Sequence, residues 1–234
     1  MAQAHANPTA AASAQKALAP RVLIIGNAPV QVDYSEFVDA SEHVIRMNEC
    51  PNYDANTGTR TTVLGLINIG VTGRDLYKKQ SLRDWRVAQQ VDEIWFRWWR
   101  FNAWDVLKTF VAHPRTRKQH LDYGDKLVRA NALEGKHLVY AQRAFINSVK
   151  KKLWEVDRGR PWKKVLPTSG FLIIERVLAD PRFKDREVNL LGFTWEAGSN
   201  KRSYRSGHTW DEEETLVQRY VEQGRLKILP CDAP

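Results

Sequence analysis

Two asparagines directly follow predicted strands, and their amide groups could bind a phosphate or the hydroxyls of a ribose. Asn27 lies in the turn Gly26-Asn27-Ala28 after the aliphatic run 22–25, and Asn48 follows a second run, 43–46. Four aliphatic residues bounded by glycine predict a strand buried on both faces, and such strands form parallel sheets. Because ligands collect at the carboxyl ends of parallel strands, we expect both asparagines to lie at a ligand-binding edge.

A third candidate is the motif Thr168-Ser169-Gly170, which stands directly before the apolar run 171–178. The spacing of that run predicts a helix packed on a sheet. A Thr or Ser cap followed by glycine leaves backbone N–H groups open at a helix start, where an anion or a ribose can bind. Taken alone, the motif is more typical of an ordinary capped helix than of a binding site.

His208 is the histidine best placed for acid–base chemistry. It follows the basic loop 198–207 and precedes the acidic run Asp211–Glu214, which favours a helix start there. A histidine with one ring nitrogen held by a neighbour can accept a proton on the other, as a general base must. On its own, a capping or surface role would be the simpler interpretation.

Several common site motifs are missing from the sequence. No cysteines and histidines have metal-ligand spacing, and no Asp-x-Asp pair is present. The first turn lacks the second and third glycines of a dinucleotide fingerprint, and there is no phosphate-binding Gly-Lys-Ser/Thr and no Gly-x-Ser-x-Gly elbow. We therefore expect neither a metal nor a cofactor.

The elements that must position these residues alternate between strand and helix. This order predicts an α/β fold of Rossmann-like type, with a mostly parallel sheet flanked by helices. The length of 234 residues favours a single domain at 21–234 after a disordered tail at 1–20. The predicted strands are 22–25, 43–46, 62–67, 93–98, 188–192 and 226–229, and the predicted helices are 141–157, 169–179 and 211–223.

The net charge of +9 is concentrated in the middle of the chain. Residues 71–164 hold 22 lysines and arginines against 10 aspartates and glutamates, a net charge of +12. Such a patch favours an anionic partner: a nucleic acid, a phospholipid head group, a lipopolysaccharide or a sugar nucleotide. A solvated basic face that only aids solubility is an equal alternative.

The segment 94–104 interleaves tryptophans with arginines. It could stack on bases or sugar rings, lie at a membrane interface, or form a core strand with an aromatic loop. Only two cysteines are present, and the first 20 residues lack the apolar run of a signal peptide. We therefore expect a cytoplasmic location, with a peripheral position at the inner membrane face as an option.

Together these segments resemble the sialylmotifs of glycosyltransferase family 29, the animal-type sialyltransferases, in a short bacterial form. The large motif is similar to residues 22–28, 39–51 and 57–62, and the small motif to 167–172 with the strand ending in Gly192 and Phe193. The final motif, a histidine with a glutamate five positions later, resembles His208 and Glu213. The resemblance covers about 21–67 and 165–229.

The resemblance implies a variant GT-A-type domain and an inverting, metal-independent transfer of sialic acid or Kdo from CMP to an acceptor hydroxyl. It implies His208 and Glu213 as the catalytic pair. The donor-nucleotide residues that it implies are Gly26, Asn27, Ala28, Asn48, Thr168, Ser169, Gly170, Gly192 and Phe193. It also implies that the variable segment 70–160 shapes the site for a glycan or lipid-linked glycan acceptor, at an anionic membrane surface if that segment binds one.

Two departures from the family affect the phosphate. Ala28 stands where the family usually has serine, and the aromatic motif around Thr194-Trp195-Glu196 lacks its histidine. Charge on the departing phosphate must then be stabilised by other residues. We expect these to be Lys201, Arg202, Tyr204 and Arg205.

Two other classes of protein remain compatible with the sequence. One is a non-catalytic homologue that binds a nucleotide or a glycan, which the missing histidine favours. The other is a basic nucleic-acid-binding module that uses the Arg and Trp stretch, and its binding would weaken steeply with salt. We expect nucleic acid to be the less favoured partner.

Overall fold

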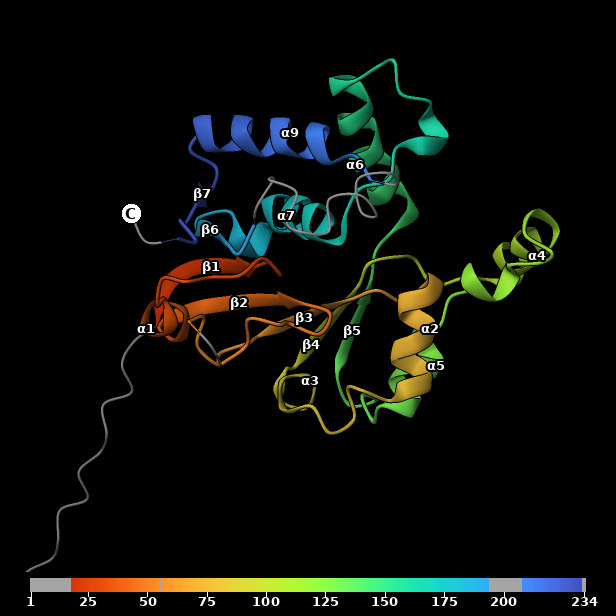
Figure 1. Cartoon of the computed structure of the whole chain (residues 1–234), viewed down its shortest axis with the longest axis horizontal. Helices are drawn as coiled ribbons and strands as arrows, with labels where there is room; N and C mark the ends of the chain where they lie inside the picture. The colour runs from red at the N-terminus through yellow and green to blue at the C-terminus, as the bar shows by residue number, and fades with distance from the viewer. Residues whose placement is uncertain (1–17, 55, 194–207, 233–234) are drawn as a thin grey trace, which may run out of the picture.

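A computed structural model describes residues 18–54, 56–193 and 208–232. Its strands form one seven-stranded sheet in the order β5-β4-β3-β2-β1-β6-β7, and every strand pairing within it is parallel (Figure 1). The strands are β1 (Ala19–Ile25), β2 (Ser41–Met47), β3 (Val63–Leu66), β4 (Glu93–Phe96), β5 (His137–Tyr140), β6 (Glu187–Leu191) and β7 (Lys227–Ile228). The predicted α/β class and Rossmann-like sheet are confirmed.

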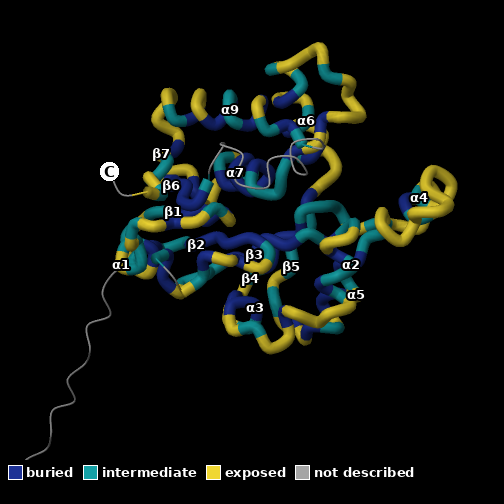
Figure 2. Tube along the Cα trace, viewed as in Figure 1, coloured by how far each residue is buried: buried dark blue, intermediate teal, exposed yellow. Residues whose placement is uncertain are grey.

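Helices cover both faces of the sheet. One face packs against α6 (Arg143–Val156), α7 (Ser169–Ala179) and α9 (Trp210–Glu222). The other face packs against α1 (Ser35–Asp39), α2 (Gly70–Lys79), α3 (Arg86–Gln90) and α5 (Gly124–Ala130). One further helix, α4 (Ala103–Ala112), projects away from both layers (Figure 1). The central strands β2 and β3 are among the most continuously buried parts of the chain (Figure 2).

The strand order places a topological switch point beside β1. From β1 to β5 the sheet grows in one direction, and the chain then returns to add β6 and β7 on the other side of β1. In open parallel sheets this arrangement leaves a crevice at the carboxyl ends of the two strands where the order reverses. In this sheet those two strands are β1 and β6, which run side by side as far as Ile25 and Leu191.

The strand β5 is one element that the sequence did not predict. Its four residues form an edge strand beside β4, and none of them is fully buried. The predicted strand 93–98 ends earlier, at Phe96. At the other end of the sheet β1 starts at Ala19, two residues before the predicted domain boundary.

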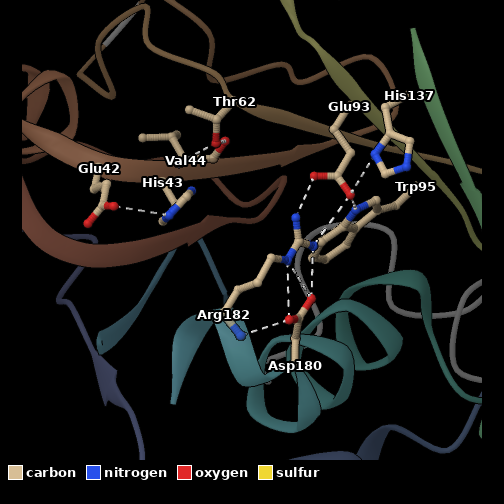
Figure 3. Close-up of polar contacts among 9 residues, drawn as sticks. All are labelled: Glu42, His43, Val44, Thr62, Glu93, Trp95, His137, Asp180 and Arg182. Carbon is tan, nitrogen blue, oxygen red and sulfur yellow. Dashed lines mark hydrogen bonds and ion pairs between the residues drawn. The ribbon is translucent and has the colours of Figure 1, made fainter. Parts of the chain in front are cut away.

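A network of charged side chains ties the segment after α7 to the amino edge of the sheet (Figure 3). Arg182 donates to Glu93 (3.0 Å) and to Asp180 (2.8 Å), and the indole of Trp95 donates to Glu93 (2.7 Å). Glu93 therefore binds Trp95 of its own strand and Arg182 of the segment after α7 at the same time. This fixes the far end of α7 and hence the direction of its amino terminus.

Buried Arg46 at the end of β2 anchors the loop that closes the large motif. Its guanidinium donates to the hydroxyls of Thr57 (2.9 Å) and Thr61 (3.0 Å) and to the carbonyl of Gly58 (2.9 Å). The side chain is fully buried, and burial lowers its pKa. A buried cation needs hydrogen-bond partners, so Arg46 of β2 and the loop 57–61 must fold together.

Candidate functional site

The turn after β1 is joined directly to the end of β6. The N–H of Gly26 donates to the carbonyl of Leu191 (2.7 Å), and the N–H of Ala28 donates to that of Gly192 (3.0 Å). A Cβ on Gly26 would lie 2.3 Å from the Gly192 oxygen, and Gly192 itself has a φ of +72°. Only glycine fits such contact at both positions. The two predicted donor-binding segments therefore lie in direct contact at the carboxyl ends of β1 and β6.

Asn52 holds this turn from the side and was not predicted from the sequence. Its amide nitrogen donates to the carbonyls of Gly26 (3.0 Å) and Ala28 (2.6 Å). The side chain is buried, so these carbonyls have little access to water. Asn52 thus fixes the backbone on either side of Asn27, whose own side chain is exposed and available to a ligand.

Replacing Asn52 with alanine is expected to cost about 2 kcal/mol in the free energy of unfolding, because two buried carbonyls lose their donor. It should also weaken nucleotide binding, since the turn around Asn27 loosens. Asn56→Ala is the matched control, because Asn56 likewise donates to two carbonyls, those of Val30 and Gln31 (both 2.9 Å). Urea unfolding should show a smaller stability loss for Asn56→Ala, whose hydrogen bonds are less buried, and CMP titration should show weaker binding only for Asn52→Ala. Equal CMP affinity in both variants would contradict this role.

Asn48 lies at the end of β2 in a left-handed conformation, with a φ of +52°. Its N–H donates to the Gly65 carbonyl (2.8 Å), and its side-chain oxygen accepts from the N–H of Ile67 (3.2 Å). Asparagine tolerates this conformation better than most residues. The amide group of Asn48 thus also fixes the chain that leaves β3.

The amino terminus of α7 lies at the same edge of the sheet. Thr168 is the N-cap of α7, as predicted, because its hydroxyl accepts from the N–H of Phe171 (3.1 Å). A Cβ on Gly170 would lie 2.9 Å from the Phe193 ring and 3.7 Å from the Met47 methyl group. The structure therefore brings Gly170, next to the Thr168 cap, against the ends of β2 and β6.

Glu213 lies beneath this helix start and is fully buried. Its carboxylate accepts from the N–H of Thr168 (2.7 Å), from the Thr168 hydroxyl (2.6 Å) and from the Thr209 hydroxyl (3.2 Å). Burial raises its pKa to about 7, against the opposing effect of these hydrogen bonds. A carboxylate with no exposed surface cannot reach a substrate, so its predicted catalytic role becomes one of positioning Thr168.

The raised pKa of Glu213 makes folding depend on pH. Its folded pKa of about 7 exceeds the usual 4.5, so between these values the folded protein holds a proton that the unfolded chain has lost. Stability therefore falls as the pH rises from about 4.5 to about 7, by roughly 3 kcal/mol for this group alone.

Glu213→Gln should remove this contribution, because an amide does not titrate. We expect the free energy of unfolding of the wild type, minus that of the variant, to decrease by about 3 kcal/mol between pH 4.5 and 7.5. Urea unfolding at several pH values measures the difference. Glu222→Gln, at an exposed position of the same helix, should follow the wild type. Parallel curves for wild type and Glu213→Gln would refute the assignment.

His208 stands just before α9, with its ring oriented by a backbone carbonyl. Its Nδ1 lies 3.0 Å from the carbonyl oxygen of Leu166. Since a carbonyl can only accept, Nδ1 carries the proton and Nε2 is left with a free lone pair. Burial lowers the pKa of His208, and the charge of Arg97 lowers it further. The ring is therefore neutral near pH 7, in the tautomer that a general base requires.

Arg97 is the second residue that was not predicted as part of the site. It follows β4 and donates to the carbonyl of Pro167 (2.6 Å), directly before Thr168. Its Nε is buried without a hydrogen-bond partner among the described residues. Burial lowers its pKa to about 10 while Glu213 opposes that shift, so the guanidinium stays charged at neutral pH. Arg97 and Ser169 also line the same cavity of about 20 Å³.

The residues expected to bind the phosphate, Lys201, Arg202, Tyr204 and Arg205, lie outside the described residues. Within the parts that the structure does describe, no group of three or more His, Cys, Asp and Glu side chains is arranged to hold a metal ion. The positive charge seen at the site is that of Arg97.

Comparison with protein families gives one match that spans nearly the whole chain. Residues 12–224 match the model of glycosyltransferase family 29 (sialyltransferase). The chain belongs to glycosyltransferase family 29. This confirms the family suggested by the motifs around Gly26, Thr168 and His208.

Solved structures support the fold of this family 29 member. A mammalian sialyltransferase matches with a TM-score of 0.53 and 17% sequence identity, over 90% of this chain and 69% of its own. A second structure, of a mammalian sialyltransferase in complex with Gal-beta-1-3GalNAc-ortho-nitrophenol, matches with a TM-score of 0.52 and 19% identity over the same shares. At this level of identity the likeness establishes the shared fold.

One curated relative of this family 29 member has a name of a different kind. The urease operon 23 kDa accessory protein of Rhizobium meliloti (strain 1021) is 26% identical over 221 residues, which cover 89% of this chain and 92% of the relative. The two chains are therefore similar along nearly their full lengths.

The Trp-rich stretch of this family 29 member divides between core and surface. Trp95 and Phe96 of β4 are buried, and Trp98 and Trp99 stack with ring centroids 4.8 Å apart and pack partly against the core. Trp104, by contrast, is 59% exposed. The interpretation as a core strand with an aromatic loop is confirmed for residues 94–99.

Proposed function

We propose that this chain is an inverting glycosyltransferase that moves a 2-keto acid sugar, sialic acid or Kdo, from its CMP donor to an acceptor hydroxyl. The observation that carries the proposal is the hydrogen bond from His208 to the Leu166 carbonyl, two residues before the Thr168 cap. It leaves an unprotonated ring nitrogen beside a helix start and a switch-point crevice. Family membership supports the reaction class.

In this proposal the CMP moiety binds along the wall formed by Asn27, Gly192, Phe193 and Gly170. Open N–H groups at the start of α7 suit a ribose or a phosphate, because the helix dipole adds partial positive charge there. Nε2 of His208 removes the proton from the acceptor hydroxyl, whose oxygen attacks the anomeric carbon. The bond from that carbon to the phosphate oxygen breaks at the same time, and CMP leaves.

Arg97 is proposed to stabilise negative charge on the donor. It is a charged group close enough to Glu213 and His208 to shift their pKa values. A donor of this class brings both a phosphate and a sugar carboxylate, and the positive charge of Arg97 would stabilise either of them. The candidates Lys201, Arg202, Tyr204 and Arg205 remain proposals for the same task.

The acceptor is proposed to be a glycan or a lipid-linked glycan, bound on the side built by residues 70–160. The reaction is proposed to need neither metal nor cofactor, so activity should persist in EDTA. A position at the inner face of a membrane also remains a proposal. The structure describes no helix that is long and apolar enough to span a bilayer.

A panel of nucleotides tests the donor class before any acceptor is known. CMP and CDP at about 100 times their dissociation constants should stabilise the protein by roughly 3 kcal/mol, visible as a rise in Tm. UDP, GDP and S-adenosylmethionine should have little effect. Stabilisation by UDP or GDP alone would overturn the proposed donor.

A second candidate function is a non-catalytic accessory role, which the Rhizobium meliloti relative suggests by its name. Such a protein would bind a nucleotide or a glycan without turnover. It would give the same thermal shift with CMP, but it would release no CMP from a CMP-sugar. An assay of CMP release therefore distinguishes the two candidate functions, whereas an assay of CMP binding does not.

A further inference from the structure

The projecting helix α4 exposes an unusual amount of apolar surface. Of its ten residues, Trp104 is 59% exposed, Leu107 52%, Phe110 41% and Val111 75%. These are half of the eight large hydrophobic side chains exposed in the described parts of the chain. Figure 2 shows the helix standing apart from the packed layers with most of its length exposed. Contiguous apolar surface of this kind marks an interaction site in a folded protein.

The base of α4 is held firmly even though its apolar side is uncovered. Asn102 and Asp105 form a capping box at its start, and buried Asp105 also pairs with Arg143 of α6. The N–H of Phe101 donates to Asp122 (3.1 Å). The helix therefore uses its polar groups to attach to the protein and leaves its apolar residues for another partner.

Cations surround these apolar residues. The Lys108 ammonium lies 5.2 Å from the centre of the Trp104 ring, and the Arg117 guanidinium 5.0 Å from that of Phe110. Arg115 and Lys118 are exposed in the segment that follows the helix. Lys108, Arg115, Arg117 and Lys118 thus outnumber the one acidic residue of 103–120, Asp105, which is already paired.

We propose that α4 and residues 113–120 dock on an anionic phospholipid surface. Tryptophan with neighbouring aliphatic residues suits the boundary between head groups and acyl chains, and lysine and arginine suit anionic head groups. Charge argues against a second copy of this chain, because two such basic surfaces would repel each other. Leu107 and Val111 offer no plane on which a nucleic-acid base could stack.

The position of α4 relates this surface to the candidate site without depending on it. The helix follows β4, so it leaves the sheet at the carboxyl edge, where Arg97 also lies. Docking there would place that edge toward the lipid surface. The inference concerns binding to lipid and stands whether or not the proposed transfer occurs.

Vesicle flotation with the full chain tests the inference. The probes are vesicles of phosphatidylcholine alone and of phosphatidylcholine with an equal share of phosphatidylglycerol. Leu107→Asp and Val111→Asp are the test variants. Leu18→Asp is the matched control, because Leu18 is 40% exposed and precedes β1, at the opposite edge of the sheet.

We expect the wild type and Leu18→Asp to float with the anionic vesicles and not with the neutral ones. Both test variants should bind at least about tenfold more weakly, since each loses the transfer of a large apolar side chain out of water. Added salt should weaken wild-type binding. The proposal would be overturned if all variants bound equally or if the wild type floated equally with neutral vesicles. It would also be overturned if the test variants changed their oligomeric state without losing flotation.

Discussion

Replacing His208 with alanine is expected to lower turnover about 10²- to 10⁴-fold while leaving the fold and CMP affinity nearly unchanged. The ring of His208 is oriented by the Leu166 carbonyl, which leaves Nε2 to take the acceptor's proton. Alanine removes the only group that we propose for that step. Initial rates of sugar transfer from CMP-sialic acid or CMP-Kdo, with CMP titration in parallel, measure both expectations.

The pH profile gives a second readout for His208. Its pKa is lowered by burial, so the acid limb of kcat/KM should have its midpoint below the ordinary value of about 6.5. His137→Ala is the matched control, because His137 has a 73% exposed side chain near Glu93 at the opposite edge of the sheet. It should retain full activity. Full activity in His208→Ala would remove His208 as the base.

Replacing Arg97 with methionine is expected to lower kcat/KM for the donor about 10²- to 10³-fold, the usual cost of removing one preorganised group that stabilises developing charge. Methionine keeps most of the side-chain volume but removes both the charge and the N–H groups. The loss should appear with every acceptor tested, because Arg97 is proposed to act on the donor. Steady-state kinetics with varied donor concentration measure it.

Two further variants separate this role from a structural one. Arg97→Lys keeps the charge and should recover part of the activity. Arg100→Met makes the same change three residues later at an exposed position and should have little effect. Because Arg97 opposes the raised pKa of Glu213, its loss should raise that pKa further. Activity in Arg97→Met equal to that of Arg100→Met would contradict the assignment.

The strands that the sequence predicted well are those buried on both faces. β1 carries an uninterrupted aliphatic run and β6 one that is broken only by buried Asn189, a composition typical of central parallel strands. β5 has no such run, since His137 is exposed and the other three residues are half-buried at the sheet edge. Local pattern therefore predicted the centre of the sheet, but β5 gains its order from pairing with β4.

For the site, the sequence predicted the residues whose motifs are local. The turn at Gly26 directly follows an aliphatic strand, and the Thr168 cap binds the N–H of Phe171 only three residues later, so both have a local signal in the sequence. Asn52 and Arg97 were missed because their partners are distant in sequence. Asn52 donates a hydrogen bond to the carbonyl of Gly26 in the turn after β1, and Arg97 lies near Glu213 of α9. Nothing in either local sequence signals such contacts.

Glu213 occupies the motif position five residues after His208 that the sequence suggested, but its burial gives it a different role from the one predicted. The pairing of His208 with Glu213 in sequence suggested two groups that act on substrate. In the fold the glutamate turns inward and binds Thr168, while the histidine stays near the surface. The five-residue spacing fixes both at the start of α9, and burial decides which can reach a ligand.

The most direct test of the proposed reaction is the release of CMP from CMP-sialic acid and CMP-Kdo, in the presence of EDTA, by wild type and by His208→Ala. An assay that detects free CMP needs no knowledge of the acceptor when a mixture of glycans is supplied. We expect the wild type to release CMP from at least one donor and the variant to be slower by about 10²-fold or more. No release by the wild type from either donor, despite stabilisation by CMP, would contradict a transferase and favour the accessory role.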